Sequence, residues 1–145
     1  MLQTAREEGV APALSEVIEI RASGDLVTIR SAIRARSAEL GFSLIDQTKI
    51  VTAASELARN TLTHGGGGRV RVEALRKDGR TGLRLTFEDQ GPGIADIELA
   101  MKDGYTTGGG LGLGLGGSKR LMSEFDIWSK PGQGARVTVT RWKLL

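Results

Sequence analysis

The chain has 145 residues, of which 39% are hydrophobic and 26% charged, and it contains no cysteine. This length suits one domain with its own core, and the lack of cysteine excludes disulfide scaffolds, thiol nucleophiles and thiolate metal sites. The net charge of +3 comes from 20 basic and 17 acidic residues that are spread along the chain, and only 4% of the residues are aromatic, so no nucleic-acid binding is expected.

Residues 1–15 are expected to form a loose N-terminal segment. Arg6, Glu7 and Glu8 stand where a signal peptide would need an apolar stretch. No apolar run in the chain approaches the roughly 18 residues of a membrane-spanning helix. We therefore expect one domain over residues 16–145, no membrane attachment and a cytoplasmic location.

A strand and two helices are predicted in the first half of the chain. Apolar residues at 17–20 mark the strand, and Asp25 is a suitable N-cap for a helix that Gly41 would stop. The second helix is expected to begin at Ser43 and to end near Gly65.

The second half of the chain is predicted to consist mainly of strands separated by turns. Residues 70–74 and 83–89 alternate apolar and polar side chains, and Asp78-Gly79 between them is typical of a tight hairpin turn. The remaining elements are expected to be a short helix over 97–103 capped by Asp96, a glycine-rich stretch, a helix through about Phe125, and two strands over 126–129 and 135–142 around a turn at 131–134. This order predicts an α+β fold with a largely antiparallel sheet covered by helices on one face.

Glu56 and Asn60 stand four residues apart on the second predicted helix. Their side chains therefore share one helix face, one turn apart. The carboxylate can accept a proton, and the amide oxygen is a suitable ligand for Mg²⁺ beside a phosphate. Taken alone, however, the pair is more typical of a solvated helix face.

Asp89 ends a predicted strand and is followed by Gly91 and Gly93 on either side of a proline. A carboxylate in this position can accept a hydrogen bond from a flat ligand that carries an exocyclic amine. Asp, Gly and Pro are also the commonest turn residues, so this motif alone favours an ordinary turn.

The chain is rich in glycine, with 21 in total and a dense group between Gly104 and Gly117. Leucines interleave with these glycines, which favours a folded loop over a flexible linker. A glycine-rich loop that enters a helix presents backbone N–H groups to a phosphate. A P-loop is excluded because Ser118-Lys119 stands in the wrong order, and a Rossmann unit is excluded because too few residues follow the glycines.

In combination and in this order, the three motifs resemble the Bergerat ATP-binding fold of the GHKL superfamily, which includes gyrase-type ATPases, histidine kinases and MutL. Four segments are most similar to RsbT-type switch kinases of bacterial stress signalling, namely residues 55–60, 88–94, 103–109 and 117–125. The resemblance covers roughly residues 15–143. It implies a Bergerat-type two-layer sandwich in which residues 16–145 form a single ATP-binding kinase domain.

The resemblance also implies a role for each motif. Glu56 would be the catalytic carboxylate that takes the proton of a serine or threonine hydroxyl, Asn60 would coordinate Mg²⁺, and Asp89 would accept a hydrogen bond from the adenine amine. Residues 104–111 would form the lid over ATP. The residues implied in ATP binding are Asn60, Asp89, Gly91, Gly93, Ile94, Thr106, Thr107, Gly108, Gly109, Gly110, Leu111, Gly112, Leu113 and Gly114.

By the same resemblance, the chain is a serine/threonine kinase that uses ATP and Mg²⁺ to phosphorylate a STAS-domain antagonist. Release from that antagonist would let it bind and activate a PP2C-type phosphatase, which is partner switching. Two alternatives stay open, an anti-sigma factor with serine kinase activity and a module that binds nucleotide and partners without transferring phosphate.

The sequence departs from the family pattern at one position near the expected adenine site. The family often has a threonine after the glycine of the closing hairpin, where this chain has Ala135. The hydroxyl contact is then either missing or supplied by Thr138 or Thr140.

Overall fold

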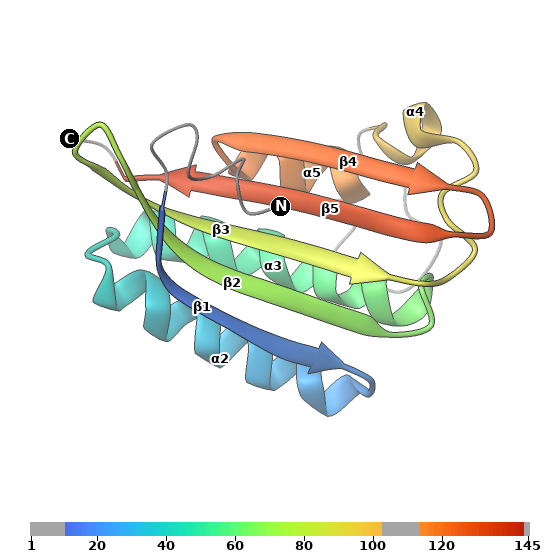
Figure 1. Cartoon of the computed structure of the whole chain (residues 1–145), viewed down its shortest axis with the longest axis horizontal. Coiled ribbons are helices and arrows are strands. Elements are labelled where there is room, and N and C mark those ends of the chain that lie inside the picture. The colour runs from blue at the N-terminus through green and yellow to red at the C-terminus, as the bar shows by residue number, and fades with distance from the viewer. Residues whose placement is uncertain (1–10, 103–113, 144–145) are drawn as a thin grey trace.

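The fold is built on one sheet of five antiparallel strands in the order β1-β2-β3-β5-β4 (Figure 1). The computed structural model describes residues 11–102 and 114–143. The strands are β1 (Ala11–Ile20), β2 (Gly68–Lys77), β3 (Arg80–Asp89), β4 (Glu124–Lys130) and β5 (Gly134–Trp142).

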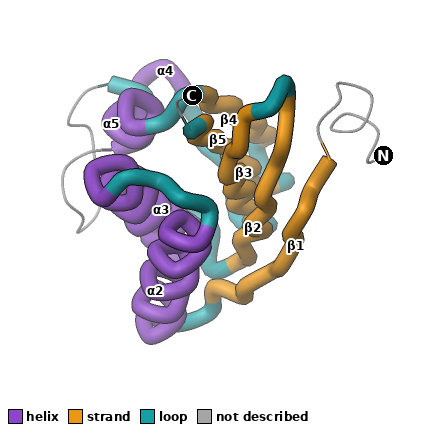
Figure 2. The backbone as a smooth tube through the Cα atoms, turned by 90° about the vertical axis from the view of Figure 1, so that its left-hand side faces the viewer, coloured by secondary structure: helices purple, strands orange, loops and turns teal. Residues whose placement is uncertain are grey.

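Helices α2 (Ser23–Glu39), α3 (Leu44–Thr63) and α5 (Gly114–Leu121) lie on one face of the sheet (Figure 2). Helix α3 packs against both of the others, and the short α4 (Ile97–Ala100) contacts α5. None of the described helices is long and apolar enough to cross a lipid bilayer. The predicted α+β class, the predicted order of elements and the one-sided cover of helices are confirmed.

The hydrophobic core lies between the sheet and its helices. On the sheet, Val70, Leu85 and Phe87 are at most 2% exposed, and on the helices Ile33 and Leu57 are at most 1% exposed. Burial of each such side chain stabilises the fold by about 1.5–3 kcal/mol. This packing holds α3 against β3, and these two elements carry Glu56, Asn60 and Asp89.

Local signals in the sequence set the ends of α3 and of the β2–β3 hairpin as predicted. The Ser43 hydroxyl accepts a hydrogen bond from the Asp46 N–H at 3.1 Å and caps α3. Asp78 and Gly79 join β2 to β3 with φ of 52° and 78°, the conformation that a type I′ hairpin turn requires.

Several boundaries differ from the predictions: α4 ends at Ala100 rather than at 103, and β4 begins at Glu124 rather than at 126. In two further cases contacts between elements override local patterns. Strand β1 begins at Ala11, inside the segment expected to be loose, and pairs with β2. Helix α5 ends at Leu121, so the prediction that it reaches Phe125 is wrong. Ser123 donates its N–H to the Thr140 carbonyl at 2.8 Å, and this bond directs the chain into the sheet before another helical turn can form.

Asp25 is not the N-cap of α2, as the sequence predicted, but lies inside the first turn. The N-cap is Ala22, and the carboxylate of Asp25 accepts hydrogen bonds from the N–H groups of Arg21 and Ala22 at 2.8 and 3.0 Å. These backbone hydrogen bonds, that from Arg21 first, hold the pKa of Asp25 below its ordinary value of 3.8. The carboxylate therefore stabilises the start of α2 only while it is ionised.

We expect Asp25→Ala to lower the melting temperature by a few degrees at neutral pH. Because the folded-state pKa lies below the unfolded value near 3.8, the stabilisation is complete above that value and is lost as pH falls through the folded pKa. Thermal unfolding measured from pH 7 down to pH 2.5 should show the gap between wild type and variant closing at the acid end. Asp126→Ala, at an exposed aspartate on β4, is the control and should show no such closing gap.

Candidate functional site

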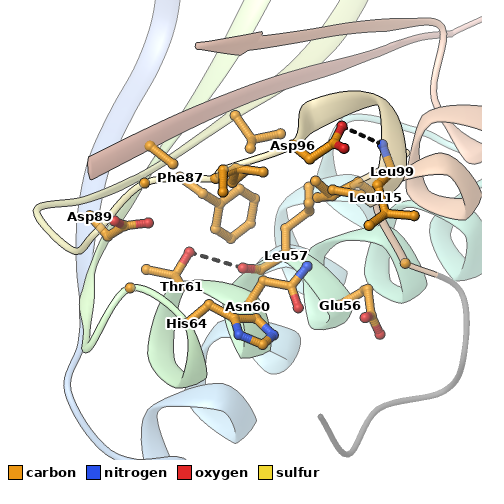
Figure 3. A pocket seen from close by; sticks show the side chains of 18 residues that line it. Glu56, Leu57, Asn60, Thr61, His64, Phe87, Asp89, Asp96, Leu99 and Leu115 are labelled. Carbon is orange, nitrogen blue, oxygen red and sulfur yellow. Dashed lines mark hydrogen bonds between the residues drawn. The ribbon is translucent and has the colours of Figure 1, made fainter. Parts of the chain in front are cut away.

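A cavity of about 340 Å³ lies between α3, the ends of β3 and β5, and the loop that leads into α4 (Figure 3). This volume is within the range of ligand pockets, roughly 300–1,000 Å³. The structure brings six of the residues that the sequence predicted as site residues to its walls: Glu56, Asn60, Asp89, Gly93, Ile94 and Gly114. The described parts of the three motifs therefore meet at one site.

Glu56 is the most buried charged side chain of this cavity. It lies on α3, is 2% exposed, and its Oε1 atom has no hydrogen-bond partner within residues 11–102 and 114–143. Burying a carboxylate oxygen without a partner is costly, so this atom has room for a partner such as a ligand, a water or an ion. Glu56 therefore does not lie on a solvated helix face, the alternative that the sequence had allowed.

Asn60 lies one turn after Glu56, half-buried, on the wall of the same cavity. The backbone carbonyl oxygen of Asn60 accepts hydrogen bonds from the N–H groups of His64 and Gly65 at 2.9 and 3.2 Å, and these two bonds end α3. Its side-chain amide points toward the cavity in Figure 3. Helical spacing thus places the carboxylate of Glu56 and the amide of Asn60 one turn apart on the wall of the same cavity.

Asp89 is held at the end of β3 by two glycine-containing turns. Its Oδ1 atom accepts the Gly91 N–H at 2.9 Å, as in an Asx turn. A Cβ atom added to Gly65 would lie 2.6 Å from Asp89 Oδ2, and one added to Gly91 would lie 2.7 Å from the Gly65 carbonyl oxygen. Gly91 does not line the cavity, but its N–H group holds the Asp89 carboxylate in place. Gly65 lines the cavity and is a site residue that the sequence did not predict.

The loop after Asp89 is tied to the β4–β5 hairpin. The Ser129 hydroxyl accepts the Ile94 N–H at 2.6 Å, and the Pro92 carbonyl accepts the Gly132 N–H at 2.9 Å. Gly93 adopts φ of +82°, and a Cβ atom there would lie 2.6 Å from the Lys130 carbonyl oxygen. These contacts fix Ile94 as an apolar wall of the cavity.

Position 135 has no hydroxyl because it is alanine, and no other residue of β5 brings a hydroxyl into the cavity. Ala135 and Val137 line the cavity, whereas Thr138 and Thr140 line a groove on the opposite face of the sheet with Trp142. Side chains alternate between the two faces of a strand, so neither threonine can reach the cavity. The suggestion that Thr138 or Thr140 supplies the contact is therefore wrong.

The glycine-rich motif is described only in part. Gly114 begins α5 and lines the cavity together with Leu115, so the positive end of this helix is directed at the site. The other predicted ligands from this motif, Thr106, Thr107, Gly108, Gly109, Gly110, Leu111, Gly112 and Leu113, lie outside the described residues.

Comparisons with known proteins agree with this geometry. Residues 45–144 match the family model described as histidine kinase-, DNA gyrase B- and HSP90-like ATPase. The chain is 45% identical to the serine/threonine-protein kinase RsbT of Bacillus subtilis over 86% of its own length and 94% of that kinase. It is 31% identical to an anti-sigma F factor of a Thermoanaerobacter species over 78% of its length and 82% of that factor.

A solved structure shares the fold. The crystal structure of the RsbU and RsbW domains of a Mycobacterium tuberculosis protein matches with a TM-score of 0.62 at 24% identity. The match covers 93% of this chain and 34% of that longer chain, so the shared part is about one third of that protein.

Proposed function

Because the chain belongs to the family of histidine kinase-, DNA gyrase B- and HSP90-like ATPases, we propose that it is an ATP-dependent protein serine/threonine kinase that works by partner switching. In this proposal it phosphorylates a STAS-domain antagonist and, once released, activates a PP2C-type phosphatase. The observation that carries the proposal is the buried carboxylate of Glu56 beside Asn60 in the cavity. The 45% identity to a relative named as a serine/threonine-protein kinase supports it.

Asp89 recognises the adenine end of ATP. Its Oδ1 atom is already engaged by the Gly91 N–H, so Oδ2 is left to accept a hydrogen bond from the 6-amino group. Phe87, Val137 and Ile94 supply apolar walls for the flat base. A fixed acceptor between apolar walls favours a planar ligand with an amine at its edge.

Glu56 takes part in the chemistry at the other end of the nucleotide. The hydroxyl oxygen of the substrate serine or threonine attacks the γ-phosphorus, and the bond from that phosphorus to the β–γ bridging oxygen breaks. The hydroxyl proton passes to the carboxylate of Glu56, and ADP leaves. The N-terminus of α5, at Gly114, offers positive potential to the phosphates during this transfer.

Asn60 is suited to hold Mg²⁺ together with the nucleotide. Within residues 11–102 and 114–143 no cluster of three or more His, Asp or Glu side chains is present that could hold a metal ion by itself. The amide oxygen of Asn60 is a hard ligand, and Mg²⁺ commonly takes most of its other ligands from phosphates and water. When bound, the ion would neutralise charge that develops on the phosphate oxygens.

An anti-sigma factor is the second candidate, because anti-sigma F factors are among the relatives at about 31% identity. The two candidates differ in their protein partners rather than in their nucleotide chemistry. A stable complex of this chain with a sigma factor in gel filtration, formed in the presence of Mg·ADP or Mg·ATP, would favour the anti-sigma factor. Transfer of phosphate to a STAS-domain protein without any sigma-factor complex would favour the switch kinase.

The proposal is tested with γ-labelled ATP and the purified STAS-domain proteins of the same organism. We expect the wild-type chain to place label on a serine or threonine of one of them. Asn60→Ala should lose Mg²⁺ coordination, so that both the affinity for Mg·ATP and the rate of transfer fall together. If the wild-type chain binds nucleotide but transfers phosphate to none of these proteins, the proposed kinase activity is contradicted. The chain would then be a module that binds nucleotide without transferring phosphate.

A further inference from the structure

A second hydrogen-bond acceptor lies next to Asp89 in the cavity, the hydroxyl of Thr61 on α3. Thr61 and Asp89 line the same cavity, and Figure 3 shows Thr61 next to Asp89 and above the last turns of α3. Thr61 is 4% exposed, so its hydroxyl is screened from bulk water. None of the three motifs includes this residue.

The orientation of the Thr61 side chain is fixed from two sides. Its Oγ1 atom donates a hydrogen bond to the Leu57 carbonyl at 2.9 Å. Its methyl group packs toward Gly68, where an added Cβ atom would lie 2.9 Å from Thr61 Cγ2. Gly68 is the direct cross-strand partner of Asp89, so this packing places Thr61 at the end of β3 that carries Asp89.

The hydroxyl of Thr61 can only accept a hydrogen bond from a ligand. A hydroxyl has one proton and two lone pairs, and the proton is already used on Leu57. Figure 3 shows the Asp89 carboxylate and the Thr61 side chain at the same end of the cavity, so two acceptors lie there. An exocyclic amine has two protons and can donate one hydrogen bond to each acceptor. A carbonyl oxygen at that position has no proton to donate, and its lone pairs would be repelled by both acceptors.

We propose that Thr61 is a specificity-determining residue that accepts the second proton of the adenine 6-amino group, while Asp89 accepts the first. This inference rests on the proposed function, since it takes ATP as the ligand. It also accounts for Ala135, because the hydroxyl absent from β5 is provided by the facing helix. Thr61 thereby contributes to the choice of a 6-amino purine over a 6-oxo purine.

The test compares ATP with purine riboside triphosphate, which has the same ring system and phosphates but no 6-amino group. Binding of both ligands is measured by titration calorimetry for wild type, Thr61→Val and Thr61→Ser. Valine keeps the shape and the methyl group and removes the acceptor, and serine keeps the hydroxyl. Thr63→Val is the matched control, because Thr63 makes the same hydrogen bond, to the Arg59 carbonyl at 2.8 Å, on the exposed side of α3.

We expect Thr61→Val to weaken ATP binding by roughly three- to tenfold, the worth of one neutral hydrogen bond. Binding of purine riboside triphosphate should change by less than about twofold, because that ligand never made the bond. Thr63→Val should resemble wild type with both ligands, and Thr61→Ser, which keeps the acceptor, should bind ATP more tightly than Thr61→Val does.

The outcomes separate this inference from the proposed function. Failure of the wild-type chain to bind ATP would overturn the proposed function itself. If wild type binds ATP, an equal loss for both ligands in Thr61→Val, or no loss for either, would overturn the role of Thr61. Thermal unfolding checks that each variant is folded; if valine prevents folding, Thr61→Ala provides the same comparison with a residue that favours helices.

Discussion

Glu56→Gln is expected to slow phosphoryl transfer by roughly 10²–10⁴-fold while Mg·ATP still binds. The glutamine keeps the size of the side chain and removes its ability to take a proton, and a positioned general base contributes about this factor to a rate. The adenine contacts proposed for Asp89 do not involve this carboxylate, and Figure 3 shows the two side chains at different parts of the cavity. Single-turnover transfer to the proposed STAS-domain substrate, measured beside an ATP titration, separates the chemical step from binding.

A matched control for this variant is Glu39→Gln, on the exposed side of α2, where the carboxylate pairs with Arg36. It removes the same charge without touching the cavity, and its transfer rate should equal that of wild type. Near-normal transfer by Glu56→Gln would show that Glu56 is not the base. The buried carboxylate would then support a nucleotide site without assigning the proton acceptor.

Asp89→Asn is expected to weaken nucleotide binding by roughly ten- to a hundredfold. It replaces a charged acceptor by an amide whose NH₂ group faces the adenine amine, and a charge-assisted hydrogen bond contributes about 1.5–3 kcal/mol. Glu88→Gln is the control, because Glu88 lies next in the chain but pairs with Arg69 at 3.5 Å on the opposite face of the sheet. The affinity of the variant for Mg·ADP is measured by calorimetric titration. If the variant binds as tightly as wild type, Asp89 does not recognise the adenine.

Spacing along the sequence was sufficient to predict part of the candidate site. Glu56 and Asn60 meet because four residues make about one helical turn, and Asp89 ends a strand whose alternation is visible in the sequence. These rules are local, so they hold in any context in which the element forms. Spacing alone did not decide between a solvated helix face and a buried site; that difference depends on what packs over the helix.

The residues that the sequence did not reveal act through contacts between distant segments. Ser129 holds Ile94 across 35 positions, and Gly65 meets Asp89 only because α3 ends beside the end of β3. Thr61 makes the same local hydrogen bond as Thr63, and the two differ in that Thr61 lines the cavity whereas Thr63 is exposed. The early end of α5 has the same cause, since its C-terminal neighbour Ser123 pairs with β5.

The turn over residues 65–68 restricts which substitutions the sequence can accept. In composition it looks like a tolerant spacer, yet each of its glycines meets a separate constraint. Gly65 and Gly68 have no room for a Cβ atom, and Gly66 and Gly67 adopt φ of +76° and +104°. Each of these four positions therefore disfavours a larger residue, for lack of space or for backbone strain, so this surface turn limits the substitutions available to the protein during evolution.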